Sequence, residues 1–129
     1  MKRIKILLVD DNKSLSFGLK EYLQDYNMNV SIVNSAEKAF EKYKIDEFDV
    51  IIVDLRLPGM NGEDFILSCE RKYNNLKYII YTGSSDYTLK KELKNSANLS
   101  KNIIKKPLNG FKKIKKEIDS LIGDSDNCD

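Results

Sequence analysis

The sequence contains no histidine, and this absence narrows the chemistry open to the chain. Without histidine there is no Ser-His or Cys-His nucleophilic device, and no histidine-ligated metal. The two cysteines, Cys69 and Cys128, are too few for a disulfide framework, so both are expected to be free thiols. The apolar run near the N-terminus is too short for a secretory signal, and we therefore expect a cytoplasmic protein.

Charge and hydropathy exclude two further classes of protein. The 22 basic and 20 acidic residues give a net charge of +2, which does not favour direct binding of nucleic acid. No apolar run approaches the roughly 20 residues that a membrane span needs, so membrane insertion is not expected. The 129 residues, with an apolar fraction of 41%, are typical of one globular domain with one core.

Short apolar runs alternate along the chain with segments of helical periodicity. The runs predict strands at residues 6–9, 29–34, 50–53, 76–81 and 103–104. Apolar residues at helical spacing follow each of them, at 15–26, 36–43, 65–73, 89–97 and 111–122. Asn34 and Glu37 have the spacing of a capping box at the start of the second helix, and Gly123 is expected to end the last helix.

This alternation predicts a parallel sheet with helices on both faces. Central strands read as continuous apolar runs, whereas the second predicted strand is mixed and the fifth is short, so these two are assigned to the edges. Right-handed crossovers then favour the order 2-1-3-4-5 of a flavodoxin-like, doubly wound α/β fold. Residues 1–122 would form this domain and residues 123–129 a flexible tail.

Polar residues end the predicted strands, and such folds bind ligands at that edge of the sheet. Three carboxylates, one hydroxyl and two lysines are placed there: Asp10, Asp11, Asp54, Thr82, Lys105 and Lys106. Clustered carboxylates repel one another unless a proton or a cation lies among them. Oxygen ligands alone favour a hard cation, Mg²⁺, Mn²⁺ or Ca²⁺, and of these Mg²⁺ usually shares its ligand shell with a phosphate.

Asp54 is the best candidate for a nucleophile that receives a phosphoryl group. Its carboxylate is already anionic, whereas the Thr82 hydroxyl has no neighbouring base to activate it. A metal ion and Lys106 would neutralise charge on the transferring group. Plain structural roles are the alternatives, with Asp54 as a strand-end residue and Thr82 as a helix cap. Lys105 competes with Lys106, and the residue directly before Pro107 is preferred.

Four motifs follow one another along the chain, each at the end of a predicted strand: VDD (9–11), VDLRLPGMNG (53–62), YTG (81–83) and KKP (105–107). Together they resemble the receiver domain of two-component response regulators. The resemblance implies that Asp54 accepts a phosphoryl group from a phosphohistidine on a sensor histidine kinase or a histidine phosphotransfer protein. It also implies that Mg²⁺ is held by Asp11, Asp54 and the backbone carbonyl of Arg56, with Asp10 helping through water.

The resemblance assigns the remaining roles as well. Thr82 would hydrogen-bond the acyl phosphate and carry the switch, Lys106 would pair with it, and the Lys106–Pro107 peptide is commonly cis in the family. The output would be a phosphorelay step or the binding of an unidentified downstream protein, with a homodimer formed on phosphorylation as the other outcome. No recognisable output domain follows residue 122, so we expect a lone receiver that acts as a phosphoacceptor rather than as an enzyme.

Some features depart from the family pattern. Gly83 stands where alanine is more common, and the segment NSANLSKNI (95–103) is longer than usual. Ile103 stands where many members carry tyrosine or phenylalanine, which predicts an output without an aromatic rotamer switch. The lysines of the last helix are interpreted as its solvated face, with a basic binding patch as the alternative; they are Lys112, Lys113, Lys115 and Lys116.

Three other functions compete with that of a phosphorylatable receiver. A receiver that has lost phosphotransfer and serves only as a docking module is disfavoured by the intact set of strand-end residues. A phosphohydrolase would need a further acid or base near the nucleophile, and Arg56 cannot serve as one. A flavin protein would need a hydroxyl-rich phosphate loop after the first strand, where DDNKS (10–14) is anionic.

Overall fold

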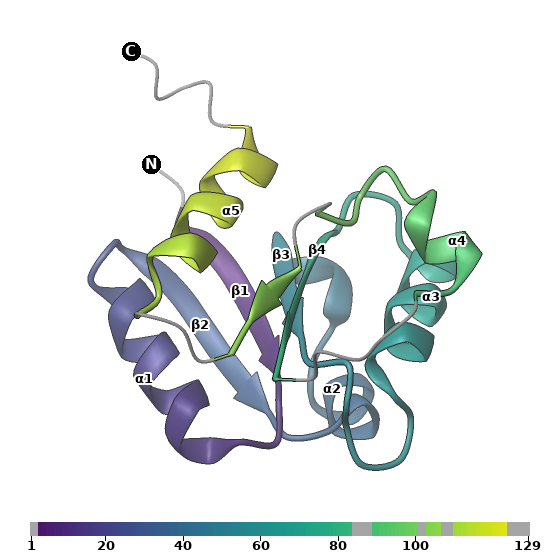
Figure 1. The fold of residues 1–129 in the computed structure, drawn as a ribbon, viewed down its shortest axis with the longest axis horizontal. Coiled ribbons are helices and arrows are strands. Elements are labelled where there is room, and N and C mark those ends of the chain that lie inside the picture. Colours follow the sequence, from purple (N-terminus) through teal and green to yellow (C-terminus); the bar gives the residue numbers. More distant parts are fainter. Residues whose placement is uncertain (1–2, 84–88, 101–102, 107–109, 124–129) are drawn as a thin grey trace.

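A parallel sheet of five strands forms the centre of the molecule (Figure 1). The computed structural model describes residues 3–83, 89–100, 103–106 and 110–123. The strands are β1 (Ile4–Val9), β2 (Met28–Val33), β3 (Val50–Val53), β4 (Lys77–Thr82) and β5 (Ile104–Lys105). Their order is β2-β1-β3-β4-β5 with every pair parallel, which confirms the predicted flavodoxin-like topology.

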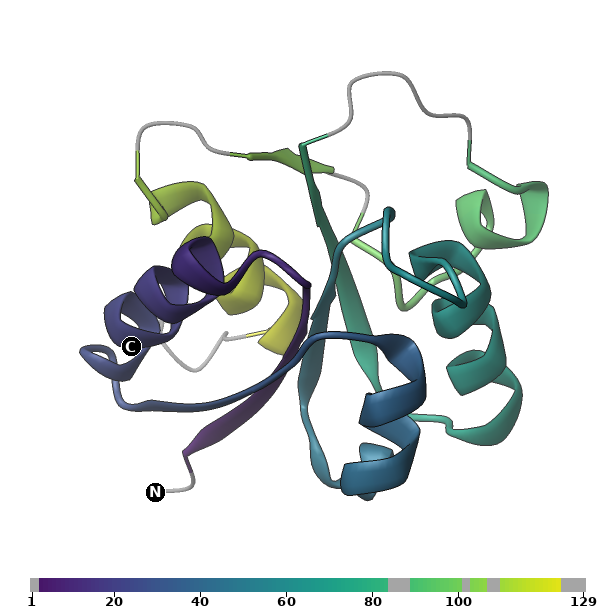
Figure 2. The same ribbon diagram turned by 90° about the horizontal axis from the view of Figure 1, so that it is seen from below.

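Helices cover both faces of the sheet (Figure 2). Helices α1 (Lys13–Gln24) and α5 (Lys112–Ile122) lie on one face. The other face is covered by α2 (Ala36–Lys42), α3 (Gly62–Lys72) and α4 (Lys91–Lys94), and a 3₁₀ turn, η1 (Ile45–Glu47), precedes β3. None of the helices in the described part of the chain is both long enough and apolar enough to cross a membrane.

Each face of the sheet has its own core because side chains alternate along the strands. Ile6 and Leu8 of β1 pack under α1 and α5, whereas Leu7 and Val9 pack under α2 and α3. The strand β3 pairs with β1 so that Val53 lies opposite Val9. Because these two strands end level with each other, the residues that follow them emerge side by side at one edge of the sheet.

Polar side chains and one glycine set the helix ends. The Asn12 side chain accepts a hydrogen bond from the backbone N–H of Leu15 at 3.1 Å and caps α1. The predicted capping box of Asn34 and Glu37 is wrong, because Ser35 caps α2 by accepting from Lys38 N at 3.1 Å. Helix α5 ends at Gly123, as expected, with the left-handed φ of 72° that glycine adopts without strain.

Several other predictions concern the C-terminal half. The helix expected over residues 89–97 is only the short α4, at Lys91–Lys94. Lys112, Lys113 and Lys116 are exposed on α5, whereas Lys115 is half-buried and its Nζ lies 2.6 Å from Asp119 Oδ2. Cys69, a residue of α3, is a buried free thiol, and burial raises its pKa to about 12. Cys128 and the rest of the expected tail, 124–129, lie outside the described residues.

Candidate functional site

Three carboxylates gather at the edge where the strands end. Oxygen atoms of Asp10, Asp11 and Asp54 all lie within 4.8 Å of one another. Asp10 follows β1 and donates its backbone N–H to Val33 O at 3.0 Å, and Asp54 follows β3 and donates to Val9 O at 3.0 Å. The sheet hydrogen bonding therefore continues into both aspartates and fixes their backbones. Asp10 and Asp54 are buried, with 2% and 7% of their surface exposed, and Asp11 faces solvent.

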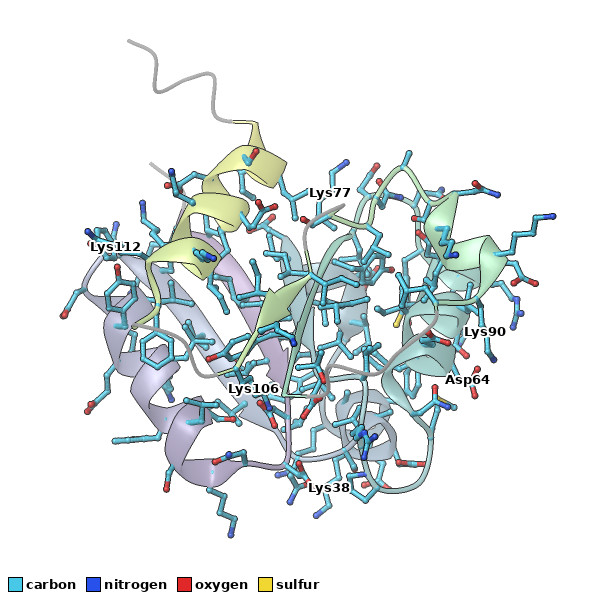
Figure 3. All side chains as sticks on the ribbon, in the orientation of Figure 1. Lys38, Asp64, Lys77, Lys90, Lys106 and Lys112 are labelled. Carbon is cyan, nitrogen blue, oxygen red and sulfur yellow. The ribbon has the colours of Figure 1, made fainter. Side chains whose placement is uncertain are left out.

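Lys106 supplies a positive charge to this cluster. Its Nζ lies 2.6 Å from Asp10 Oδ2 and 2.9 Å from Asp54 Oδ2. The backbone N–H of Lys106 donates to Thr82 O at 2.9 Å, which extends the pairing between β4 and β5 by one residue. Lys105 is exposed, so of the two lysines considered from the sequence it is Lys106 that reaches the carboxylates. Figure 3 shows Lys106 at the edge of the sheet toward which the arrows of β1 and β2 point.

Burial and charge act against each other on the two ionisable partners. Burial raises the pKa of Asp10, although the ammonium of Lys106 and the N–H of Asn12, 3.0 Å from Asp10 Oδ1, lower it in part. Burial lowers the pKa of Lys106, but the hydrogen bonds and charges of Asp10 and Asp54 outweigh it and raise that pKa overall. The lysine is thus held as an ammonium, facing more carboxylates than it can neutralise.

The oxygen donors fit a hard divalent cation. The three clustered carboxylates offer hard oxygen ligands, and the donor set includes neither imidazole nor thiolate. Asp11 lies on the exposed side of the cluster, which leaves room for the water ligands that Mg²⁺ retains.

The loop between β3 and α3 closes around Asp54. The backbone N–H of Arg56 donates to Asp54 Oδ1 at 3.1 Å and orients the carboxylate, while the Arg56 side chain is exposed. The N–H of Gly62, the first residue of α3, donates to Leu55 O at 3.0 Å. A Cβ on Gly62 would lie 2.3 Å from the carbonyl oxygen of Asp54, so only glycine fits there. The sequence places Gly62 at the end of the motif VDLRLPGMNG but gives no sign of this contact.

The end of β4 lies beside the lysine. Thr82 is fully buried, and Lys106 Nζ lies 5.5 Å from the centre of the Tyr81 ring. Burial raises the pKa of Tyr81 to about 12. A Cβ on Gly83 would have Lys106 Cβ at 4.0 Å as its nearest neighbour, so space does not require glycine at this position. Pro107 is not among the described residues, and the expected cis peptide therefore stays a prediction.

A cationic hollow adjoins the acidic cluster. It has a volume of about 220 Å³ and is lined by Asp10, Lys13, Ile32, Val33, Asn34, Lys38 and Lys42. Figure 3 shows Lys38 at the same edge of the molecule as Lys106. An anionic group that approaches the acidic cluster past the end of β2 would therefore pass positive charge before it reaches the carboxylates.

Comparisons with known proteins agree with the fold. The profile of the family described as response regulator receiver domain matches residues 6–119. Among curated proteins, the autoinducer 2 sensor kinase/phosphatase LuxQ of Vibrio vulnificus is 44% identical over 59 residues, which are 46% of this chain and 7% of LuxQ. The chain thus spans well under two thirds of the length of the curated relatives that it matches.

Solved structures extend the likeness over nearly the whole chain. The non-phosphorylated HemR receiver domain of Leptospira biflexa is 26% identical with a TM-score of 0.76, covering 94% of this chain and 95% of that one. The response regulator protein TrrA of Thermotoga maritima, solved in complex with Mg²⁺-BeF, is 25% identical with a TM-score of 0.77, covering 92% of this chain and 98% of that one.

Proposed function

The chain belongs to the family of response regulator receiver domains, and from this premise we propose that Asp54 accepts a phosphoryl group from a phosphohistidine on a sensor histidine kinase or a histidine phosphotransfer protein. The observation that carries the proposal is the meeting of Asp54 with Asp10 and Lys106 at the edge of the sheet. A carboxylate oxygen of Asp54 forms a bond to phosphorus as the P–N bond to the donor histidine breaks. The released imidazole then takes up a proton from solvent.

The residues around Asp54 prepare it for this reaction. Arg56 N holds Oδ1, and Lys106 Nζ faces Oδ2, so the carboxylate is fixed before a donor arrives. Once the acyl phosphate has formed, the Lys106 ammonium pairs with a phosphoryl oxygen and balances its charge. The Thr82 hydroxyl, at the end of the neighbouring strand β4, senses the phosphoryl group by donating a hydrogen bond to it.

Mg²⁺ would be held by Asp11, Asp54 and the backbone carbonyl of Arg56, with Asp10 acting through a water molecule. The clustered carboxylate oxygens support this assignment, and so does the similarity to TrrA, which was solved with Mg²⁺-BeF. When bound, the ion would neutralise negative charge on the phosphoryl oxygens. Among this chain's own residues, Asp10 and Lys106 then keep the inner side of the site electrically balanced.

The receiver would act as a phosphorelay intermediate or as a switch for binding a partner protein. The similarity to a sensor kinase/phosphatase supports a place in histidine-to-aspartate signalling. A stand-alone receiver, a downstream target and a homodimer formed on phosphorylation remain predictions. The face of α4, β5 and α5 is the proposed output surface, because Thr82 and Lys106 connect the site directly to it.

Intact-mass measurement tests the proposal. The full chain is incubated with Mg²⁺ and acetyl phosphate, a small acyl-phosphate donor, and the mass should rise by one phosphoryl group. Asp54→Asn or a chelator should abolish the gain, whereas Asp46→Asn, which alters an exposed aspartate in η1, should not. A gain that persists in Asp54→Asn would contradict the assignment of the acceptor, and a gain that persists with chelator would contradict the metal requirement.

A further inference from the structure

One side chain of α2 ties down the loop that carries the phosphoryl-acceptor site. The Oε2 atom of Glu37 accepts a hydrogen bond from the backbone N–H of Met60 at 2.9 Å, across 23 residues of sequence. This N–H, followed by the backbone N–H of Glu37 itself, lowers the pKa of the Glu37 carboxyl. Glu37 therefore presents a carboxylate to the loop, while Ser35 provides the N-cap of α2.

The glycine beside Met60 shows how closely the carboxylate approaches the loop. Gly59 has a φ of 76°, in the left-handed region that favours glycine. A Cβ on Gly59 would lie 2.7 Å from Glu37 Oε2 and 3.0 Å from Oε1. The loop backbone at Gly59 thus packs directly against the carboxylate that binds Met60 N.

Three ties together set the path of the loop from β3 to α3. Arg56 N is bound to Asp54 Oδ1 at 3.1 Å, and Gly62 N is bound to Leu55 O at 3.0 Å. Both of these ties lie at the base of the loop. The bond to Glu37 holds its outer part, at Met60. Arg56 forms one of the ties at the base, and the loop runs from it to the outer tie at Met60.

We propose that Glu37 is a positioning residue for phosphoryl transfer, which holds the β3–α3 loop so that the backbone of Arg56 stays beside Asp54. The inference rests on the proposed function of the site. Glu37 touches no reacting atom; its carboxylate acts through the loop, in the way that an outer-shell partner orients a metal ligand. A carboxylate on α2 is thereby part of the machinery, although it lies on a different helix from every motif residue.

Four variants separate this tie from the negative charge of Glu37. Glu37→Ala removes the acceptor, and Glu37→Asp keeps the charge but shortens the reach. Glu37→Gln keeps an acceptor oxygen at the same reach and loses the charge. Glu41→Ala is the matched control, because it removes an exposed carboxylate from the same helix. The readouts are amide hydrogen exchange at Met60 without metal, Mg²⁺ affinity by calorimetry, and the phosphorylation rate with acetyl phosphate.

We expect Glu37→Ala and Glu37→Asp to speed exchange at Met60 and to weaken Mg²⁺ binding about tenfold, the lower end of the effect of outer-shell partners. Phosphorylation should slow in the same variants, whereas Glu37→Gln and Glu41→Ala should stay close to wild type. Circular dichroism checks that each variant is folded.

The other outcomes contradict either the proposed function of the site or the positioning role of Glu37. If the wild-type chain neither binds Mg²⁺ nor gains a phosphoryl group, the proposed function fails and the role of Glu37 fails with it. If the wild type does both and Glu37→Ala matches it, the positioning role alone is wrong. The positioning role is also wrong if Glu41→Ala or Glu37→Gln is as impaired as Glu37→Ala. In either case the loss of negative charge, and not the loss of the hydrogen bond to Met60 N, would explain the effect.

Discussion

The Nζ atom of Lys106 lies 2.9 Å from Asp54 Oδ2, although β4 separates the strands that precede the two residues. The same Nζ lies 2.6 Å from Asp10 Oδ2, so one ammonium is shared by two buried carboxylates. Lys106 is therefore the main positive charge that the described residues place among these acids. In the proposed reaction, the phosphoryl group would come to lie between Asp54 and this ammonium.

Removing that charge should destabilise the metal-free protein. Lys106→Met keeps most of the side-chain volume but leaves Asp10 and Asp54 buried without a cation. Breaking a buried pair in this way costs about 3 kcal/mol of unfolding free energy. Urea unfolding measures the loss, and Lys105→Met, at the exposed neighbour, is the control. Equal stability of the two variants would show that the ammonium does not hold the carboxylates together.

Asp10→Asn should have the opposite effect on the metal-free protein. Burial raises the pKa of Asp10 above the ordinary value of 3.8, so its charged form is disfavoured in the folded state. Asparagine removes this penalty and keeps an oxygen that can accept from Asn12 N. Lys106 keeps Asp54 as its partner in the variant. We expect a gain of roughly 1 kcal/mol in unfolding free energy at neutral pH.

The raised pKa of Asp10 also predicts how the stability difference between Asp10→Asn and wild type changes with pH. Between pH 3.8 and the raised pKa, the folded protein binds the Asp10 proton more tightly than the unfolded chain does. Stability contributed by this group therefore falls as pH rises through that window. The advantage of Asp10→Asn over wild type should accordingly be absent at acidic pH and appear as pH rises. A constant advantage, or a less stable variant at neutral pH, would contradict the assigned cause.

Gly62→Ala should disturb the backbone of Asp54 without changing any charged residue of the site. The added Cβ would lie 2.3 Å from Asp54 O and 2.9 Å from Leu55 Cα, both backbone atoms that cannot turn away. Overpacking of this kind costs about 1–3 kcal/mol, and here it would displace Asp54, the proposed acceptor of the phosphoryl group. Thermal unfolding and the phosphorylation rate measure the two effects. Gly83→Ala is the control, because its Cβ would meet Lys106 Cβ only at 4.0 Å and should be tolerated.

The sheet and the gathering of the acids could be predicted from the sequence because both follow from periodic local patterns. Solid apolar runs such as Val50–Val53 identify central strands, and the parallel order places residues that follow strands at one edge. Asp10 and Asp54 meet for that reason. The sequence also favoured Lys106 over Lys105 by its place before Pro107, and the pairing of Lys106 N with Thr82 O places that lysine against the carboxylates.

Contacts between distant residues could not be predicted in the same way. Glu37 fits a local capping pattern, yet its carboxylate binds Met60 N on another element, and Ser35 caps the helix. No local sequence pattern distinguishes a glutamate that caps its own helix from one that binds the backbone of a distant loop. Helix α4 is shorter than its apolar spacing suggests and ends at Lys94, with Asn95 as its C-cap. The steric need for Gly62 arises only when α3 is brought against the backbone of Asp54 and Leu55.

Arg56 should prolong the life of the phosphoryl group. Its side chain is exposed two residues after Asp54, where it can cover the acyl phosphate or pair with its oxygens. Arg56→Ala and Arg56→Asn should therefore lose phosphate faster than wild type, while their backbone N–H still binds Asp54 Oδ1. Time courses of dephosphorylation by intact mass measure the rate, with Arg71→Ala, at an exposed arginine of α3, as the control. Unchanged rates in both Arg56 variants would exclude shielding by this side chain.

Phosphorylation should alter the face of α4, β5 and α5 without an aromatic side chain changing rotamer. Ile103 directly precedes β5 and is half-buried against the core beneath α3 and α4. Isoleucine is branched at Cβ and stiff about its first torsion, so it fills space there but cannot carry a ring between two pockets. A shift of the backbone after Thr82 must then transmit the change, and the glycine at position 83 permits it.

Amide hydrogen exchange with and without Mg²⁺ and beryllofluoride, an acyl-phosphate mimic, measures this response. We expect altered exchange at Thr82, at Gly83, in α4 and at Ile103 to Lys106, because the pairing of Lys106 N with Thr82 O couples these segments. Helix α2 should stay unchanged beyond its tie to Met60, since it packs on the sheet away from β5. The Asp54→Asn variant controls for effects of the mimic elsewhere. A response confined to α1 and α2, or equal in Asp54→Asn, would show that the signal does not leave the site through Thr82 and Lys106.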